Sequence, residues 1–383
     1  MSLKMKLTST ICAFLLILGL VITGVFAVPQ ATVNLGGTLT FKASDVYARV
    51  TGTITGSKED PTLTPIEFNA GSASGTSTWT NNLAFKDEGS EITISINVEN
   101  LASDRPLYVS IVDSVGTIVN VSKTLTNGAF ELAAGANDTA TFTMEVTNKN
   151  ASITSGANYG YVVELLDASA IPSYDAVSGL TLTCDTNAKT ASVTGHTLTA
   201  KTDVVIPAYV KSGDVVCEVT SVGGFADMDG NGGYLSSIVL PNTITTISGG
   251  AFYGNTNFTN LIIPEKVTEL NEMQFQGCSG ITNVLLNNNL TTLSGIGIIG
   301  GHYTYIEIPS SLSIIGLETF FNCYQLETIV IPSSVTEIGY NAFSSCSALK
   351  TVLFKGTAEQ WSAISIWEGE GNDPVRNANI IYI

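Results

Sequence analysis

The chain has 383 residues, of which 44% are hydrophobic and 13% are charged, so it is long and apolar enough to fold and is not a disordered chain. Acidic residues outnumber basic ones by 33 to 16, and the formal charge of -17 repels nucleic acid phosphates, which excludes DNA and RNA as expected partners. The two histidines, His196 and His302, stand in no recognisable motif, which argues against imidazole catalysis and most zinc sites.

The first residues are typical of an export signal. Lys4 and Lys6 precede an apolar run over residues 11–27, which ends in Val25-Phe26-Ala27, the kind of site that a signal peptidase reads. We expect residues 1–27 to be a cleaved signal peptide and the mature protein to be secreted or displayed on the cell surface. The alternative is an uncleaved N-terminal anchor, because the run is at the short end of what spans a bilayer.

Residues 28–170 are expected to form an antiparallel β-sandwich. Ile92, Ile94 and Ile96 alternate with polar residues, and such period-two patterning places one face of a strand in a core. Seven or more segments of this kind, without a convincing amphipathic helix, predict a sandwich of immunoglobulin or jelly-roll type. The expected strands are 33–41, 46–54, 92–98, 107–112, 118–121, 140–146 and 159–166. The region weakly resembles β-sandwich regions of secreted bacterial matrix and surface proteins. Residues 171–179 are small, polar and proline-containing, which is typical of a linker.

Residues 180–383 repeat with a period of about 23. Pro241 and Pro264 are 23 residues apart, as are Pro309 and Pro332, and Asn287 occupies the intermediate position. A second column has spacings of 23, 23, 22 and 23 and consists of Phe252, Phe275, Ile298, Phe320 and Phe343. Two columns with one period indicate a solenoid of stacked coils.

The pattern within one coil explains why coils must stack. Before the proline position, Leu-x-x-Ile-x-Ile predicts a short strand with its apolar residues inside, and proline ends the strand because it has no N–H to donate. Burying six apolar side chains contributes on the order of 10 kcal/mol. Ordering the backbone costs roughly 1–2 kcal/mol per residue, so a single coil cannot fold alone and the ends of the stack need caps.

The segment LETIVIPSSVTEIGYNAFSSC, residues 326–346, resembles the BspA-type leucine-rich repeat. The resemblance spans about residues 180–383 and implies a leucine-rich repeat domain with an N-terminal lead-in and a C-terminal cap that seals the last layer. It also implies a role like that of the family's adhesins and surface proteins, which bind extracellular proteins or cells without catalysis. The coil at Asn287 departs from the pattern, because Ile298 replaces phenylalanine and Gly301 replaces cysteine. We expect that coil to be intact but less tightly packed.

The cysteines of this region fall into two groups. Cys278, Cys323 and Cys346 share one position of the repeat and are expected to be buried thiols, although Cys323 and Cys346 lie in adjacent coils within reach of a disulfide. Cys184 and Cys217 flank a probable pair of strands, and from their spacing alone either a disulfide or two thiols is possible.

One face of the predicted strands is a candidate binding surface, because the residues four and two positions before the proline position point outward. The candidate face comprises Val239, Asn260, Ile262, Asn283, Leu285, Tyr305, Glu307, Thr328, Val330 and Leu353. It predicts an exposed apolar column, interrupted by Glu307 and rimmed by polar residues, which suits an extracellular or host protein or a surface glycan. The alternative is that β-branched residues merely favour strands or pack against the sandwich.

Asp227, Asp229 and Asn231 have the spacing of a calcium loop, but Ile238 stands where such a loop needs a bidentate glutamate. A polar turn is therefore favoured over a calcium site, and no other cofactor is expected. No nucleophile motif accompanies either histidine, and no carboxylate pair is set apart by a motif, so an enzyme is not expected. The sequence predicts a mainly β, non-catalytic adhesion protein. The alternative is a structural component of an extracellular matrix or surface layer that self-associates through the sandwich.

Overall fold

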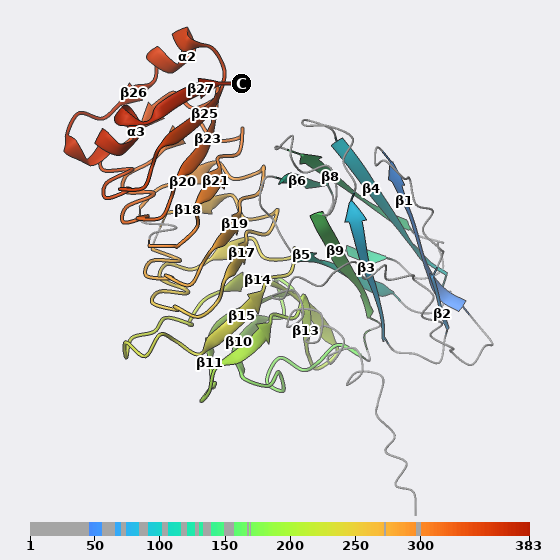
Figure 1. The fold of residues 1–383 in the computed structure, drawn as a ribbon. Coiled ribbons are helices and arrows are strands. Elements are labelled where there is room, and N and C mark those ends of the chain that lie inside the picture. The colour runs from blue at the N-terminus through green and yellow to red at the C-terminus, as the bar shows by residue number, and fades with distance from the viewer. Residues whose placement is uncertain are drawn as a thin grey trace, which may run out of the picture. The chain divides into compact units, whose positions relative to one another are not determined.

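The computed structural model describes residues 46–55, 66–69, 74–83, 91–101, 106–115, 121–126, 130–132, 139–148, 157–166, 168, 170–271, 273–295 and 300–383. The expected signal peptide at 1–27 and the strand expected at 33–41 lie outside these residues. The described chain is mainly β, as predicted, with a few short helices (Figure 1). It forms two compact units that divide between Ala170 and Ile171. Within the described ranges, no helix combines the length and apolar character needed to cross a membrane.

The first unit consists of two antiparallel sheets with the strand orders β2-β1-β4-β8-β6 and β3-β9-β5-β7. The strands are β1 (Val46–Thr55), β2 (Ile66–Asn69), β3 (Ser74–Leu83), β4 (Glu91–Asn100), β5 (Leu107–Val115), β6 (Val121–Thr126), β7 (Phe130–Leu132), β8 (Thr139–Asn148) and β9 (Ala157–Leu166). Val98 on β4 and Val109 on β5 are fully buried, and the Asn100 side chain of β4 donates a 3.0 Å hydrogen bond to the Leu132 carbonyl of β7. The predicted sandwich is confirmed. Strands β2 and β3 were not among those expected, because β3 is too polar to show alternation.

The second unit begins with a sheet of the order β10-β11-β14-β13, to which β16 adds by pairing with β14. Its strands are β10 (Leu180–Asp185), β11 (Thr190–His196), β13 (Tyr209–Ser212) and β14 (Val215–Val222). A disulfide joins Cys184 of β10 to Cys217 of β14. The pairing that the sequence left open is therefore made in the structure.

The segment expected as a linker is held against β13. Tyr174 donates its backbone N–H to the Lys211 carbonyl at 3.0 Å, and Lys211 donates to the Pro172 carbonyl at 2.9 Å. Ile171 is 1% exposed. These contacts order the start of the second unit.

A solenoid of about seven turns follows over residues 190–382. The first-row strands, which precede the proline position, are β12 (Thr202–Val205), β15 (Leu235–Val239), β17 (Asn260–Ile262), β19 (Asn283–Leu285), β21 (Tyr305–Glu307), β23 (Thr328–Pro332), β25 (Thr351–Lys355) and β27 (Asn379–Tyr382). The second-row strands are β16 (Thr246–Ile247), β18 (Glu269–Leu270), β20 (Thr292–Leu293), β22 (Ile314–Ile315), β24 (Glu337–Ile338) and β26 (Ser365–Ile366). Paired strands are parallel, and the pairs Asn260 with Asn283 and Tyr305 with Thr328 each step by 23 residues, so the sequence period is the register of the stack.

The interior of the solenoid is a ladder of phenylalanine rings. Phe252, Phe275, Phe320 and Phe343 are all 0% exposed. The rings of Phe252 and Phe275 stack at 5.1 Å between centroids, and those of Phe320 and Phe343 at 5.2 Å. The prediction that this column faces inside is confirmed.

The three cysteines of the repeat are buried free thiols, as expected. Burial raises the pKa of Cys278 to about 12 and that of Cys323 to about 11, so both are protonated at neutral pH. These thiols therefore pack as small apolar side chains.

Asn287 replaces proline with a set of hydrogen bonds. Its side chain is 2% exposed, and its Nδ2 donates to the carbonyl oxygens of Pro264 at 2.6 Å and Val267 at 2.8 Å. Its Oδ1 accepts the backbone N–H of Asn289 at 2.8 Å. The amide thus joins its own coil to the preceding one.

In two later coils a serine takes over part of this function. Ser311 Oγ donates to the Leu290 carbonyl at 2.6 Å, and Ser334 Oγ donates to the Leu312 carbonyl at 2.7 Å. Both serines lie two residues after the proline position, and both acceptors lie at the repeat position that Val267 occupies in its own coil.

The looser packing expected around Gly301 is wrong for the described part of that coil; Ile298 lies outside the described residues. One residue fewer separates Gly301 from Tyr303 than separates the equivalent cysteines from their leucines. The Tyr303 ring fills the resulting space, because a Cβ at Gly301 would lie 2.4 Å from Tyr303 Cε1. Tyr303 is 1% exposed and its hydroxyl lies 2.9 Å from Cys323 Sγ.

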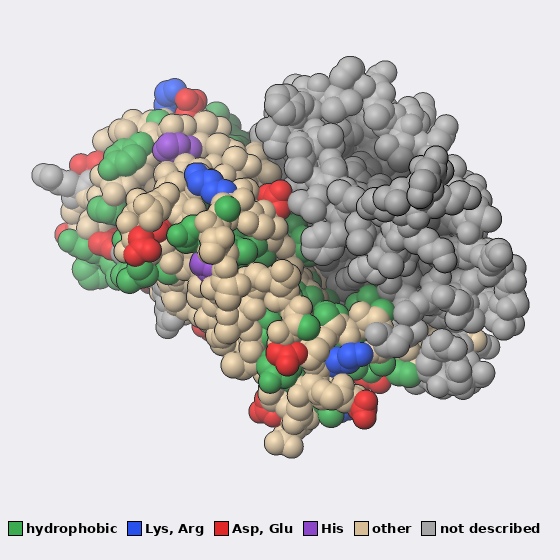
Figure 2. Space-filling view, turned by 90° about the horizontal axis from the view of Figure 1, so that it is seen from below, with side chains coloured by type: hydrophobic (Ala, Val, Ile, Leu, Met, Phe, Trp, Pro, Cys, Tyr) green, Lys and Arg blue, Asp and Glu red, His purple; other side chains and the backbone are tan. Residues whose placement is uncertain are grey.

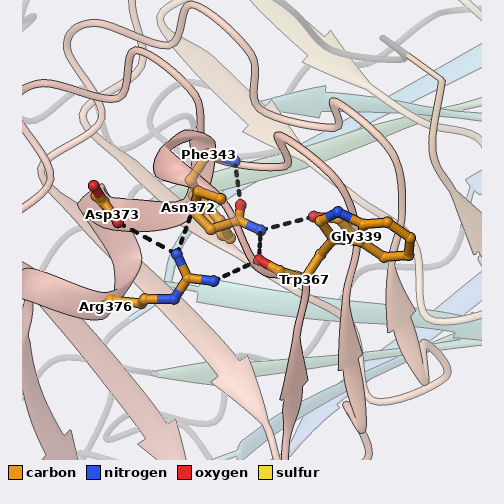
Figure 3. Close-up of polar contacts among 7 residues, drawn as sticks. Gly339, Phe343, Trp367, Asn372, Asp373 and Arg376 are labelled. Atoms are coloured by element: carbon orange, nitrogen blue, oxygen red, sulfur yellow. Dashed lines mark hydrogen bonds and ion pairs between the residues drawn. The ribbon is translucent and has the colours of Figure 1, made fainter.

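Short helices close the C-terminal end of the stack, as the resemblance implied. They are α2 (Ala358–Ser362), η1 (Glu370–Asn372) and α3 (Asp373–Asn377). Asn372 is 1% exposed; its Oδ1 accepts the Phe343 N–H at 3.2 Å and its Nδ2 donates to the Gly339 carbonyl at 2.9 Å (Figure 3). The buried amide thus satisfies backbone groups of the last regular coil that have no further coil to pair with.

Candidate binding surface of the solenoid

The first-row strands present the alternation that the candidate face requires. Leu261 and Ile306 are each 1% exposed and point inward, whereas their neighbours on β17 and β21 are half-buried. Of the ten predicted face residues, eight are half-buried, namely Val239, Asn260, Ile262, Asn283, Tyr305, Glu307, Thr328 and Leu353.

The apolar column on this face is not continuous, which corrects the expectation of an exposed stripe. Leu285 is 7% exposed and Val330 is 2% exposed, so both are buried. In β19 the alternation is reversed, because Val284 is half-buried while Leu285 lies inside. Val239, Ile262 and Leu353 therefore form separate apolar positions.

An ion pair on either side of β23 accounts for the burial of Val330. Glu307 on β21 is the register partner of Val330, and Lys355 on β25 is the register partner of Pro332. The Lys355 ammonium bonds the Glu307 carboxylate from two strands away, and the side chains are 31% and 15% exposed respectively. The lysine stem consequently crosses β23 and covers the valine.

Glu307, which the sequence marked as an interruption, is the centre of a polar cluster. The Tyr305 hydroxyl is hydrogen-bonded to its carboxylate. Burial, and then the charge and hydrogen bond of Glu307, raise the pKa of Tyr305 above its ordinary value. Tyr305 therefore presents a neutral, donating phenol beside the Lys355–Glu307 pair.

The polar column four residues before the proline position is the continuous feature of the face. The register places Asn260 beside Asn283 and Tyr305 beside Thr328, and all four are half-buried. Asn283 Nδ2 donates to Asn260 Oδ1 at 2.9 Å. Amide, phenol and hydroxyl groups thus follow one another on adjacent parallel strands, which are about 4.8 Å apart.

The predicted calcium loop is closed by its own backbone. Asp227 accepts the N–H of Gly232 at 2.7 Å and that of Asn231 at 3.3 Å, while Asp229 and Asn231 are exposed. Slight desolvation raises the pKa of Asp227, but the backbone N–H groups outweigh it and hold the pKa below its ordinary value. No group of three or more His, Cys, Asp or Glu side chains that could hold a metal ion occurs among the residues searched, which are the described ones.

His196 has a structural role that the sequence did not reveal. Its ring stacks on Phe225 at 5.4 Å, and Phe225 stacks on Phe252 at 5.7 Å, so the histidine extends the interior ladder by one ring. Its Nδ1 accepts the Leu198 N–H at 3.2 Å, and burial lowers its pKa. His302 is exposed, at the irregular coil.

A second surface, near the C-terminal cap, was also missed. Leu317, Tyr340 and Trp367 carry side chains that are 46%, 48% and 56% exposed. In the sequence these residues stand between the repeat columns, so the period assigns them no partner. Figure 2 shows one face of the molecule, on which acidic side chains lie among apolar ones.

Comparison with known proteins agrees with the fold. A family model described as BspA type leucine rich repeat region matches residues 230–297 and 300–364 with six copies. A solved leucine-rich repeat protein from Bacteroides ovatus is 24% identical, with a TM-score of 0.41, over 48% of this chain and 49% of that one. A T. pallidum leucine rich repeat protein is 22% identical, with a TM-score of 0.30, over 45% and 68%. A leucine rich cell surface protein from Faecalibacterium prausnitzii is 17% identical, with a TM-score of 0.23, over 50% and 97%.

The match therefore spans about half the length of the Bacteroides ovatus protein. No curated protein matches the chain. The resemblance drawn from residues 326–346 is confirmed by the family model, which covers that segment.

Proposed function

We propose that this chain, in which residues 230–297 and 300–364 are BspA-type leucine-rich repeats, is a secreted or cell-surface protein that binds extracellular protein or glycan ligands without catalysis. The observation that carries the proposal is the polar column Asn260, Asn283, Tyr305 and Thr328 on a rigid parallel sheet. Its hydrogen-bonding groups are fixed in position before a ligand arrives, so little side-chain entropy is lost on binding.

The chemistry of the described side chains supports binding over catalysis. Cys278, Cys323 and Cys346 are buried thiols, so they are not available as nucleophiles. His196 belongs to the interior ladder, and Glu307 is committed to the ion pair with Lys355. These groups stabilise the fold.

Two observations support an extracellular location. The N-terminal sequence has the layout of a signal peptide, with Lys4 and Lys6 before an apolar run. The disulfide between Cys184 and Cys217 suits an oxidising compartment, where such bonds persist.

The test is capture of ligands from an array of extracellular matrix proteins and bacterial surface glycans. The triple variant Asn260→Ala, Asn283→Ala, Tyr305→Phe removes polar groups from the first-row face. The control Thr246→Ala with Thr268→Ala removes exposed hydroxyls from the second-row side. We expect the face variant to lose at least ten-fold in affinity and the control to bind as wild type, with unchanged melting temperatures in the control.

Absence of any captured ligand, or equal capture by the face variant, would reject the proposal. Sizing of the purified protein addresses the matrix alternative: concentration-dependent polymers would favour a structural component, and a stable monomer would favour adhesion.

A further inference from the structure

The second-row sheet ends in a cluster of exposed apolar side chains, here termed the cap patch. It consists of Ile314, Leu317, Tyr340 and Trp367, which are 45%, 46%, 48% and 56% exposed. Ile314 lies on β22, Leu317 and Tyr340 follow β22 and β24, and Trp367 follows β26. Because β22, β24 and β26 are neighbours in this order in one sheet, the patch crosses three successive layers of the stack.

The members of the patch are in contact with one another or with neighbouring backbone. The Tyr340 and Trp367 rings meet edge to face, with centroids 6.2 Å apart and an interplanar angle of 90°. Glu318, the residue after Leu317, donates its N–H to the Tyr340 carbonyl at 2.9 Å. The patch is therefore one surface feature.

The cap fixes the main chain of Trp367 while leaving the indole in water. The Trp367 carbonyl accepts hydrogen bonds from Asn372 Nδ2, at 3.3 Å, and from the Arg376 guanidinium (Figure 3). Its N–H donates to the Ile338 carbonyl at 2.9 Å. A large aromatic side chain on a fixed backbone loses little freedom on binding, and exposed clusters of this kind mark interaction sites.

The rim of the cap patch is acidic. Glu337 is exposed and is the register partner of Ile314, Glu368 is exposed and follows Trp367, and Glu318 is half-buried and follows Leu317. The neighbouring cations are engaged elsewhere, because Arg376 pairs with Asp373 at 3.3 Å and Lys355 pairs with Glu307. The surface thus combines two aromatic rings with uncompensated carboxylates.

We propose that the cap patch binds a cationic segment of a partner protein, with lysine or arginine side chains on the faces of Tyr340 and Trp367. A cation over an indole or phenol ring gains about 0.5–2 kcal/mol, and carboxylates at the rim add charge-assisted hydrogen bonds. The net charge of -17 steers such a segment toward the protein. The patch is separate from the first-row face, so this inference does not depend on the proposed function of that face.

The experiment titrates the full chain with a short synthetic peptide of alternating lysine and leucine, followed by calorimetry and tryptophan fluorescence. We expect binding that weakens as salt is added, and no binding of the matched peptide with glutamate in place of lysine. Tyr340→Ala with Trp367→Ala should weaken binding at least ten-fold. Glu337→Gln with Glu368→Gln, which keeps the rings, should weaken it several-fold and flatten the salt dependence.

The matched control is Tyr324→Ala, which removes a tyrosine that is 53% exposed outside the cap patch. The control should bind as wild type, and all variants should keep the wild-type melting temperature because the altered side chains face water. Failure of the lysine peptide to bind, equal binding by both ring and carboxylate variants, or binding of the glutamate peptide would overturn the proposal. So would ring-dependent binding of a chito-oligosaccharide without lysine-peptide binding, which would identify a glycan site.

Discussion

Replacing Asn287 by proline should destabilise the solenoid, although proline occupies the same position in four other coils. Those four coils show that the ring fits the backbone. The substitution removes the amide that donates to Val267 O and accepts from Asn289 N. The Pro264 carbonyl keeps a partner, because it also accepts the Val267 N–H at 3.0 Å.

The expected loss follows from these contacts. Leaving the carbonyl of the buried Val267 unpaired costs about 1–3 kcal/mol, and loss of the bond to the more accessible Asn289 N–H costs about 0.5–1 kcal/mol. Proline stabilises by about 0.4–1 kcal/mol through the unfolded chain. The net loss is about 2 kcal/mol, which for a unit of this size lowers the melting temperature by about 4–8 °C.

The double variant Asn287→Pro with Asn289→Ser provides the control. Its serine hydroxyl should reach the Val267 carbonyl as Ser311 and Ser334 reach theirs, so stability should recover by about 1 kcal/mol. Differential scanning calorimetry measures both variants, and hydrogen exchange localises the change to the coil. A single variant as stable as wild type, or a double variant no better than the single one, would show that the Asn287 amide does not hold this coil.

Three further outcomes are expected. Because burial holds the pKa of His196 below 6.5, the unfolded chain binds more protons, so the melting temperature should fall as pH is lowered through about 6.5; His196→Phe should lose this dependence, and an unchanged profile would contradict it. Asn372→Ala should cost about 2–4 kcal/mol in urea unfolding, because the Phe343 N–H and Gly339 carbonyl lose their partner; a loss below about 0.5 kcal/mol would refute this. Calcium titration should leave the melting temperature unchanged, whereas Asp227→Ala should lower it without calcium, and a rise with calcium would instead support a metal site.

The period of the sequence was sufficient to predict the interior of the solenoid. Phe275 and Phe343 are inside because any residue that recurs every coil meets its own kind in the next layer, and the register steps by the same number of residues. The same logic predicted that Cys323 and Cys346 would be buried. Period alone fixes which side of a strand faces the core.

The exposed face could not be predicted as well, because its burial depends on side chains from different coils. Val330 is covered by a pair between Glu307 and Lys355, which are 48 residues apart, and neither is marked by the repeat. The cap does not follow the period, so the exposure of Trp367 depends on contacts made by Arg376 that no column reveals. His196 joined the aromatic ladder from outside the repeat.

The match between Gly301 and Tyr303 makes the coils non-interchangeable. A shortened spacer, a missing Cβ and an enlarged ring fit together at this junction, so Gly301→Cys alone would collide with the ring and Tyr303→Leu alone would leave a void. Recombination that exchanged or excised a unit here would separate the three changes. The array can therefore lengthen or shorten on either side of this junction more readily than across it, which gives an otherwise uniform stack a fixed address.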